Sequence, residues 1–428
     1  MLYVAADKYL KPKGKLGFVI TQTIFKTEGG GAGFRRLKLG DGDPLRVIQV
    51  DDFSDIQCFE GAVNRTAVVI IQKGEATRFP LHAYNVWRKR EPGANVATEA
   101  DHDEAMGVLT FSPWSARPIQ PDNPTSPWIT GRRGAIAHIE NVVGEAAYRG
   151  REGCNTLGLN GAFWVETLTT RKDGFLLVGN LHDCGKIKVR SVNMAIEPDF
   201  VFPLLRGRDV KRWKALPTYQ VIVPQDPNTP AKGFAEAEMQ SHFPKTFNYF
   251  KQFEEPLRKR KVFKLFFDVK TAPFYSVYAV GPYTFSPFKV VWREVSNNLD
   301  AAVCGTHDSR IIVPDHTLVY ISCESEEEAH FVSALMNSSP ANFIVRGYVA
   351  LHPSPHIMKY IRIPKFDPKD KLHVRLAGSS AACHAAIGSA SDEEMAVLET
   401  ANDELAAQLW NLSAPELKDI KNSLADLQ

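Results

Sequence analysis

Three short apolar runs near the N-terminus place the strongest constraint on the fold. Residues 16–21, 45–50 and 67–71 are rich in Val, Ile, Leu and Phe, and a Pro and a Gly in residues 11–14 mark a turn before the first run. Apolar runs of this length are typical of strands buried in a mostly parallel sheet. The second and third runs flank a polar loop. Residues 1–90 are therefore predicted to form the end of a doubly wound α/β sheet.

The composition is that of a packed globular protein. Of 428 residues, 44% are hydrophobic and 23% are charged, which excludes a disordered chain and suggests about two or three domains. No run approaches the ~18 apolar residues that a membrane helix needs, so no membrane partner is expected. The N-terminus reaches Asp7 and Lys8 too early for a secretory signal. Six scattered cysteines without a CxxC pair indicate free thiols and a cytoplasmic protein.

Charge is distributed unevenly along the chain. Residues 203–264 contain 13 Lys and Arg against 6 Asp and Glu, a net charge of +7. Residues 391–428 contain 2 Lys against 9 Asp and Glu, a net charge of −7. A basic middle and an acidic tail indicate a surface that binds polyanions and a separate helical appendage. An uneven solvated surface without a partner explains the same numbers.

The remaining chain divides into three parts. Residues 91–150 are rich in Pro, Gly, Ser and Asp, which predicts a linker whose Trp114 and Trp128 pack locally. Residues 151–370 are predicted to form an α+β domain with short strands and one clear helix. Residues 371–428 are predicted to be a helical tail.

Particular elements follow from local patterns in these parts. A helix is possible near residues 135–143, and strands are expected at residues 174–178, 219–223, 289–292 and 318–322. The clear helix covers residues 326–337, with Ser325 and Glu328 as a capping box. Helix-start signals at Ser391 and Ser413 predict two further helices in the tail.

Several motifs that would carry chemistry are absent or incomplete. The glycines of residues 29–33 lack the GxGxxG spacing because position 34 is Phe, so a flexible turn is favoured over a nucleotide loop. His352 and His356 are separated by two prolines, which forbid a helix, and no third ligand is near in sequence. We therefore expect no metal site.

Two segments suit nucleic acid. Phe59 begins a polar loop that leads into the third strand, as in a platform for base stacking, although a packed Phe is an equal reading. Residues 206–213 contain four cations beside Trp213, and Arg can clamp phosphates or pair with guanine. The alternative is that one arginine pairs with Asp209 and anchors the loop. A second basic cluster follows at residues 258–261.

These segments, taken in order, resemble one family across almost the whole chain. The sequence is similar to the C-terminal portion of class I adenine-N6 DNA methyltransferases of type II restriction-modification systems, with a TaqI-like C-terminal specificity domain. The segments that carry the resemblance are residues 8–21 (KYLKPKGKLGFVIT), 29–36 (GGGAGFRR), 59–66 (FEGAVNRT), 153–164 (GCNTLGLNGAFW), 204–213 (LLRGRDVKRW), 281–294 (GPYTFSPFKVVWRE), 335–341 (LMNSSPA) and 361–368 (IRIPKFDP).

The resemblance implies both a fold and a set of site residues. The fold is α/β, the end of a Rossmann-like methyltransferase sheet at residues 1–90, followed after the linker of residues 91–150 by an α+β target-recognition domain at residues 151–370 and a short helical tail. Phe59 matches the aromatic that stacks on a flipped adenine. The residues expected to contact double-stranded DNA are Asn64, Arg65, Asn155, Asn160, Arg206, Arg208, Lys211, Arg212, Trp213 and Arg293.

The chain also departs from the family pattern. The loop that binds S-adenosylmethionine is absent, and so is the Asp/Asn/Ser-Pro-Pro-aromatic tetrapeptide that orients the target amine. Residues 122–125 (DNPT) are the nearest string, and they lack the second Pro and the aromatic. The binding site of this family cofactor is therefore largely missing, and we expect the chain alone to be inactive.

Three functional hypotheses remain at this point. The first is the recognition part of a site-specific adenine methyltransferase in a prokaryotic cytoplasm, associated with the nucleoid when bound to DNA and completed by an N-terminal methyltransferase fragment or subunit. The second is a DNA-specificity subunit without catalysis. The third is a truncated remnant.

Overall fold

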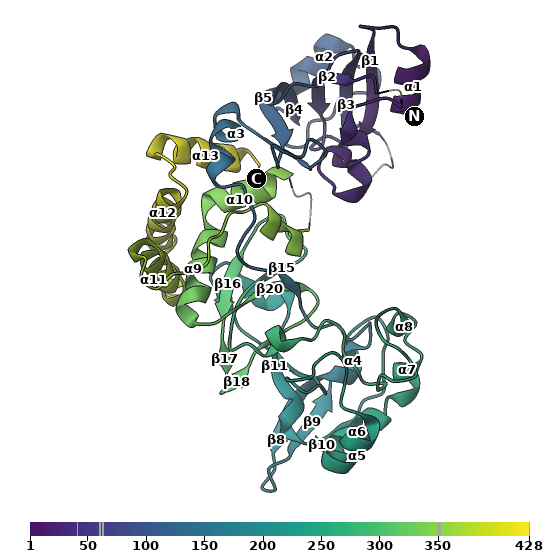
Figure 1. The fold of residues 1–428 in the computed structure, drawn as a ribbon, viewed down its shortest axis with the longest axis vertical. Coiled ribbons are helices and arrows are strands. Elements are labelled where there is room, and N and C mark those ends of the chain that lie inside the picture. Colours follow the sequence, from purple (N-terminus) through teal and green to yellow (C-terminus); the bar gives the residue numbers. More distant parts are fainter. Residues whose placement is uncertain (41, 60, 62–63, 349–351, 428) are drawn as a thin grey trace.

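The protein consists of three units arranged along its longest axis. The structure, a computed structural model, describes residues 1–40, 42–59, 61, 64–348 and 352–427. In Figure 1 the N-terminal sheet lies at the top, a smaller sheet with the C-terminal helices lies in the middle, and a second large sheet lies at the bottom. Helices α7 and α8 of the lower unit project to the side opposite α11 and α12 of the middle unit.

The upper unit is a sheet of six strands in the order β1-β3-β2-β4-β5-β6. The elements are α1 (Leu2–Tyr9), β1 (Lys15–Thr21), β2 (Leu45–Asp52), β3 (Thr66–Lys73), β4 (Leu81–Lys89), α2 (His102–Val108), β5 (Leu109–Pro118) and β6 (Trp128–Gly131). Strand β3 runs antiparallel to both β1 and β2, so those two strands point in the same direction. The three runs recognised in the sequence are therefore adjacent strands of one sheet.

The expectation of a mostly parallel sheet is wrong for this unit. Only β2 and β4 pair in parallel, and every other adjacent pair in the described sheet is antiparallel. The physical reason is visible in the burial of the strands, because residues alternate along β3 between buried and half-buried positions. Such alternation belongs to a sheet with one packed face, which antiparallel pairing permits.

Residues 109–131 also differ from the expected linker, because they form β5 and β6 of the sheet. Trp114 and Trp128 are buried in the core of the upper unit and do not form a local cluster. The ring of Trp128 stacks on Phe25, with 4.7 Å between ring centroids. Pro113 lies inside β5, and the other prolines of this segment lie at the end of β5 and in the β5–β6 turn. Composition alone does not distinguish such a segment from a linker.

The lower unit contains a second sheet of six strands in the order β10-β9-β8-β14-β11-β19. Its strands are β8 (Trp164–Thr170), β9 (Leu176–Asn180), β10 (Asn193–Ile196), β11 (Val201–Leu205), β14 (Tyr219–Ile222) and β19 (Val313–Pro314). The accompanying helices are α4 (Asn160–Phe163), α5 (Glu236–His242), α6 (Pro244–Lys251), α7 (Glu254–Arg258) and α8 (Phe263–Phe266). Aromatic residues of α6 pack on this sheet and form its core.

The middle unit joins a sheet of four strands to the C-terminal helices. The strand order is β16-β15-β20-β7, formed by β7 (Arg151–Glu152), β15 (Phe288–Arg293), β16 (Ala301–Cys304) and β20 (Leu318–Cys323). The helices are α3 (Arg133–His138), α9 (Glu326–Asn337), α10 (Ser339–Tyr348), α11 (Lys371–Ala386), α12 (Asp392–Leu409) and α13 (Ala414–Asp426). Two short ribbons complete the unit, β12 (Val210–Lys211) with β13 (Lys214–Ala215) and β17 (Thr306–His307) with β18 (Arg310–Ile311).

Several local expectations are confirmed. The helix predicted at residues 326–337 is α9, and strands lie at or next to each of the four positions expected between residues 174 and 322. Ser391 caps α12 in a full capping box with Glu394, and Ser413 caps α13 with Glu416. The box predicted for α9 forms only in part. Ser325 accepts the amide of Glu328, but the Glu328 carboxylate accepts the amide of Glu324.

The free edge of β1 has a testable consequence. β1 pairs only with β3 among the described strands, and the side chain of Val19 is 52% exposed. Alternate amides of an edge strand face solvent, whereas both edges of β3 are paired. Hydrogen exchange should therefore be fast at alternate β1 amides and slow throughout β3. Equal protection of β1 and β3 in the isolated chain would contradict an open edge.

Candidate nucleic-acid interface

The glycine-rich segment packs around an arginine. Gly29–Gly31 form a single 3-10 turn, and Gly31 is buried against the side chain of Arg35. The Arg35 guanidinium donates hydrogen bonds to the carbonyls of Ile24, Thr27 and Thr125 at 2.6–2.8 Å. A Cβ at Gly31 would clash with this arrangement. The close approach that requires glycine here is therefore an approach to Arg35.

The glycine-rich segment does not form a cradle for S-adenosylmethionine. A strand, a glycine-rich loop and a helix whose free amides face a ligand would be the expected cradle for such a nucleoside. In the described part of the upper unit, the only glycine cluster after a strand is filled by Arg35. No group of three or more His, Cys, Asp and Glu among the described residues could hold a metal ion.

The loop after β2 presents Phe59 to solvent. The Phe59 side chain is 52% exposed, and Asn64 and Arg65 at the end of the loop are exposed as well. Glu60, Ala62 and Val63 of this segment lie outside the described residues. An exposed ring beside a cation and an amide is chemically suited to stack on a base and to contact a phosphate.

The base of this loop is fixed by a buried polar network. Asp52, the last residue of β2, accepts hydrogen bonds from Gln22 at 3.0 Å, from Tyr84 at 2.5 Å and from the Ser54 amide at 2.9 Å. Burial and the adjacent carboxylate raise the pKa of Tyr84 well above its ordinary value, so its hydroxyl remains a donor. The network therefore sets the direction in which the loop leaves the sheet.

A cleft of about 240 Å³ lies beside this network, between the upper unit and α10. Its lining includes Lys26, Arg65 and Arg346, which are far apart in the sequence. Lys26 donates to the carbonyl of Gly347 at 2.7 Å and to Thr130 at 2.9 Å. Burial lowers the pKa of Lys26 to about 8, although Asp52 nearby opposes that shift. Lys26 and Arg346 could not be predicted as site residues from the sequence, because no local pattern connects them to Arg65.

The expectation that Arg206 is a free DNA contact is corrected by the structure, in which Arg206 anchors its own loop. Its guanidinium forms a two-pronged ion pair with Asp209, at 2.8 and 3.1 Å, and lies 4.4 Å from the ring centroid of Tyr219. Only 6% of Arg206 is exposed. The alternative of an arginine paired with Asp209 therefore describes Arg206, whereas Arg208 is exposed on the same turn.

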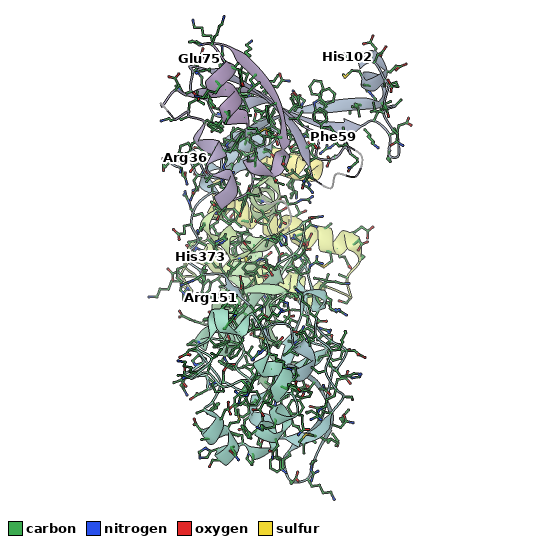
Figure 2. The ribbon with its side chains drawn as sticks, turned by 90° about the vertical axis from the view of Figure 1, so that its right-hand side faces the viewer. Arg36, Phe59, Glu75, His102, Arg151 and His373 are labelled. Carbon is green, nitrogen blue, oxygen red and sulfur yellow. The ribbon has the colours of Figure 1, made fainter. Side chains whose placement is uncertain are left out.

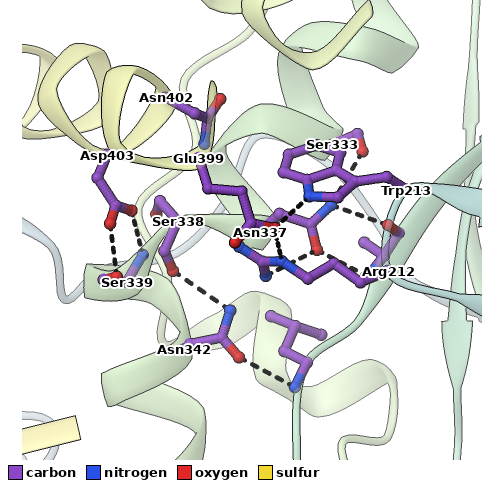
Figure 3. A network of polar contacts seen from close by, with 12 residues as sticks. Arg212, Trp213, Ser333, Asn337, Ser338, Ser339, Asn342, Glu399, Asn402 and Asp403 are labelled. Carbon is purple, nitrogen blue, oxygen red and sulfur yellow. Dashed lines mark hydrogen bonds and ion pairs between the residues drawn. The ribbon is translucent and has the colours of Figure 1, made fainter. Parts of the chain in front are cut away.

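The expectation that Arg212 and Trp213 contact DNA is corrected as well, because both side chains bond Glu399 within the chain. Figure 3 shows both side chains on Glu399 of α12. The indole of Trp213 donates to Glu399 at 2.6 Å and is 1% exposed, so neither ring face is free for a base. Arg212 also reaches Asn337 of α9 at 3.4 Å. A tryptophan beside cations in sequence does not reveal a carboxylate that lies almost 190 residues later.

Asn155, Asn160 and Arg293, three further expected contacts, each have hydrogen-bond partners within the chain. Asn155 accepts the amide of Leu157 at 2.8 Å. Asn160 is buried, with 8% exposure, and its amide oxygen accepts the Thr156 hydroxyl, which corrects its expected position at a DNA-facing surface. Arg293 is partly exposed and lies 3.3 Å from Asp300.

The basic middle of the chain is partly neutralised by its own carboxylates. Arg258 pairs with Glu254 and Glu236, and Arg260 is buried, where desolvation lowers its pKa to about 9 and four backbone carbonyls accept its hydrogen bonds. Within residues 203–264, all of which the structure describes, the exposed cations without an ion pair are Arg208, Lys211, Lys214, Lys232, Lys261 and Lys264. These six are the cations available to a polyanion.

Comparison with known proteins gives this surface a context. No family model matches the chain. A curated protein, "Type II methyltransferase M.NspV" from Nostoc sp. (strain ATCC 29411 / PCC 7524), is 28% identical over 178 residues, which are 38% of this chain and 35% of that protein. The chain therefore matches about a third of the length of this relative, and it is homologous to a type II methyltransferase over that part.

Solved structures match over a longer stretch. The type IIL restriction-modification enzyme MmeI, solved in complex with DNA, matches 96% of this chain and 50% of its own, with a TM-score of 0.50 and 10% identity. The type IIG restriction endonuclease BpuSI matches 95% of this chain and 48% of its own, with a TM-score of 0.33 and 12% identity. The mixed α/β fold is thus similar to that of MmeI, and the chain spans about half of that enzyme.

The helices of the described residues give one further structural fact. None of them combines the length and the apolar character that crossing a membrane requires.

Arg206 and Arg208, which lie on one turn, should differ in their effect on the stability of the fold. Arg206→Gln removes one partner of a buried ion pair and should lower the free energy of unfolding by about 3–5 kcal/mol. Arg208→Gln, the matched control on the same turn, should change it by less than about 0.5 kcal/mol because the side chain is exposed. Urea denaturation measures both. Equal losses would contradict the assignment of Arg206 as the anchor.

Proposed function

We propose that this chain is the DNA-recognising part of an S-adenosylmethionine-dependent DNA methyltransferase of a restriction-modification system. The observation that carries the proposal is the homology to a type II methyltransferase together with a fold that follows MmeI over 96% of the chain. The exposed cations of residues 208–264 and the exposed Phe59 add the chemistry that DNA recognition needs.

The proposed base specificity is adenine, modified at the exocyclic N6. The lone pair of that amine is delocalised into the ring, so the amine is a weak nucleophile that must be oriented by hydrogen bonds. An enzyme reaches it only after the base leaves the duplex and stacks in a pocket. Phe59, exposed at the end of the loop fixed by Asp52, is the ring that we assign to this stacking. Residues 151–370 are then proposed to correspond to a TaqI-like target-recognition domain.

The methyl donor is proposed to bind to a complementary methyltransferase segment. S-Adenosylmethionine supplies an electrophilic methyl group when it is bound, and the glycine-rich segment does not form a cradle for it. The free edge of β1 is the place where a complementary methyltransferase segment would continue the sheet. Such an enzyme would act on chromosomal DNA in a bacterial cytoplasm. A second candidate is a specificity subunit that binds DNA and leaves methyl transfer to another chain.

Binding to duplex DNA should depend strongly on salt. If about four phosphates are contacted, the slope of log K against log salt concentration should be about −3 to −4. Fluorescence anisotropy with a labelled duplex between low and moderate salt measures the slope. Changing Lys261 and Lys264 together to Gln should make the salt dependence of binding weaker. Changing the ion-paired Lys259 to Gln should weaken that dependence less. Failure to bind at low salt would contradict the proposal.

Arg208 should contribute to sequence specificity. Its side chain is exposed on a turn held in place by Arg206 and Asp209, and a bidentate contact to guanine fits that position. Arg208→Ala should cost about 1–3 kcal/mol on the cognate site and less on random DNA. Competition binding against a randomised duplex pool measures the difference. A uniform loss on all sequences would instead define a phosphate contact.

The purified chain should not transfer methyl groups by itself. Labelled S-adenosylmethionine and mixed-sequence DNA provide the assay, and methyl groups incorporated into DNA are the readout. If the first candidate holds, adding the complementary portion of a type II methyltransferase should restore methyl transfer. If the chain is a binding-only subunit, transfer should stay absent after that addition. Reproducible transfer by the pure chain would contradict the assignment of the donor site elsewhere.

A further inference from the structure

A second cleft separates the lower unit from the edge of the middle sheet. It has a volume of about 440 Å³, within the range of ligand sites, and its walls come from β7 on one side and from the segment after α8 on the other. The cleft is lined by Arg149, Arg151, Phe266, Tyr278 and Tyr283, among others. None of these five side chains belongs to the site residues predicted from the sequence.

One wall of this cleft presents a stacked guanidinium. Arg151 lies over the ring of Tyr283, with 4.5 Å between the guanidinium carbon and the ring centroid. Neither Arg149 nor Arg151 has an ion-pair partner among the described residues, although the exposed Glu152 follows Arg151 in the chain. Figure 2 shows Arg151 close to the boundary between the middle and lower units. A guanidinium stacked on one face by tyrosine can receive a base on its other face.

The opposite wall presents an aromatic pair. Phe266 stacks on Tyr278 at 3.7 Å between ring centroids, yet it remains 43% exposed. Lys261 and Lys264 are exposed on the same segment. Ala279, which also lines the cleft, has a φ of +58°, a left-handed conformation that costs a non-glycine residue about 1–2 kcal/mol. Such backbone strain is concentrated at functional sites in proteins.

We propose that this cleft binds one unstacked nucleotide of a DNA strand. The base would stack against Arg151 or Phe266, and Arg149 would contact a flanking phosphate. Planar side chains reach the face of a base only when it has left the helical stack, so the site selects an unpaired nucleotide over an intact duplex. This inference rests on the proposed DNA-binding function, and it adds a second nucleotide site far from Phe59.

The test uses the full chain and three probes. These are a duplex with one bulged 2-aminopurine, the same duplex fully paired, and free dAMP. The wild-type chain should bind the bulged duplex about tenfold more tightly than the paired one, with altered 2-aminopurine fluorescence, and should bind dAMP weakly. Arg151→Gln and Phe266→Leu should each remove most of that preference. Arg36→Gln on the upper unit and Leu265→Ala beside Phe266 are the controls and should retain it.

The outcomes separate this inference from the function beneath it. A wild-type chain that binds neither duplex at low salt contradicts both. Binding of the paired duplex with no preference for the bulge contradicts the nucleotide site alone. Equal loss on both duplexes in Arg151→Gln shows a phosphate contact and also contradicts it, as does dAMP binding as tight as that of the bulged duplex. Thermal melting of each variant verifies that the fold is retained.

Discussion

Glu399 on α12 holds residues 212–213 against the C-terminal helices. Its carboxylate accepts the indole of Trp213 and the guanidinium of Arg212, two neighbours that follow the turn carrying Arg208. Asn337 of α9 completes the arrangement by bonding both the amide and the carbonyl of Ala301 at 2.8–2.9 Å. In Figure 3 these contacts connect α9, α12 and the ribbon of β12 and β13. The exposed face of the turn is therefore positioned by groups that are themselves buried or half-buried.

Two other helices, α10 and α13, connect the upper unit to the rest of the chain. Asp426 near the end of α13 pairs with Arg132 at 2.5–2.8 Å, and Lys26 of the upper unit donates to Gly347 in α10. The acidic tail is therefore not a separate appendage, because its carboxylates pair with Arg132 and Arg212, which lie far earlier in the chain. What remains exposed in the basic middle is a smaller set of cations, concentrated on one turn and beside α8.

Sequence reasoning succeeded where the determining interactions are local. Ser391 with Glu394 and Ser413 with Glu416 lie three residues apart, so their capping boxes could be predicted, and the apolar periodicity of α9 placed that helix correctly. It failed where the partner is distant. The strand direction in the upper sheet, the burial of Trp128 on Phe25 and the pairing of Trp213 with Glu399 depend on chain segments that no local pattern connects.

The candidate site shows the same division. Arg208 and Phe59 could be named from composition and resemblance, and both are exposed. Arg206 carries an identical local signal, but Asp209 three residues later forms a nearly ideal ion pair with it and removes it from the surface. The clefts lined by Lys26 with Arg346 and by Arg151 with Phe266 each combine segments more than a hundred residues apart. Only the folded chain brings them together.

The central claim is that duplex DNA binds the exposed cations of residues 208–214 and 261–264. Amide hydrogen exchange of the full chain, with and without a mixed-sequence duplex at low salt, tests it most directly. The account expects slower exchange on DNA binding in residues 206–217 and 259–272, with no change in α11 and α12. Protection confined to α11 and α12, or exchange that is unchanged by saturating DNA, would contradict it.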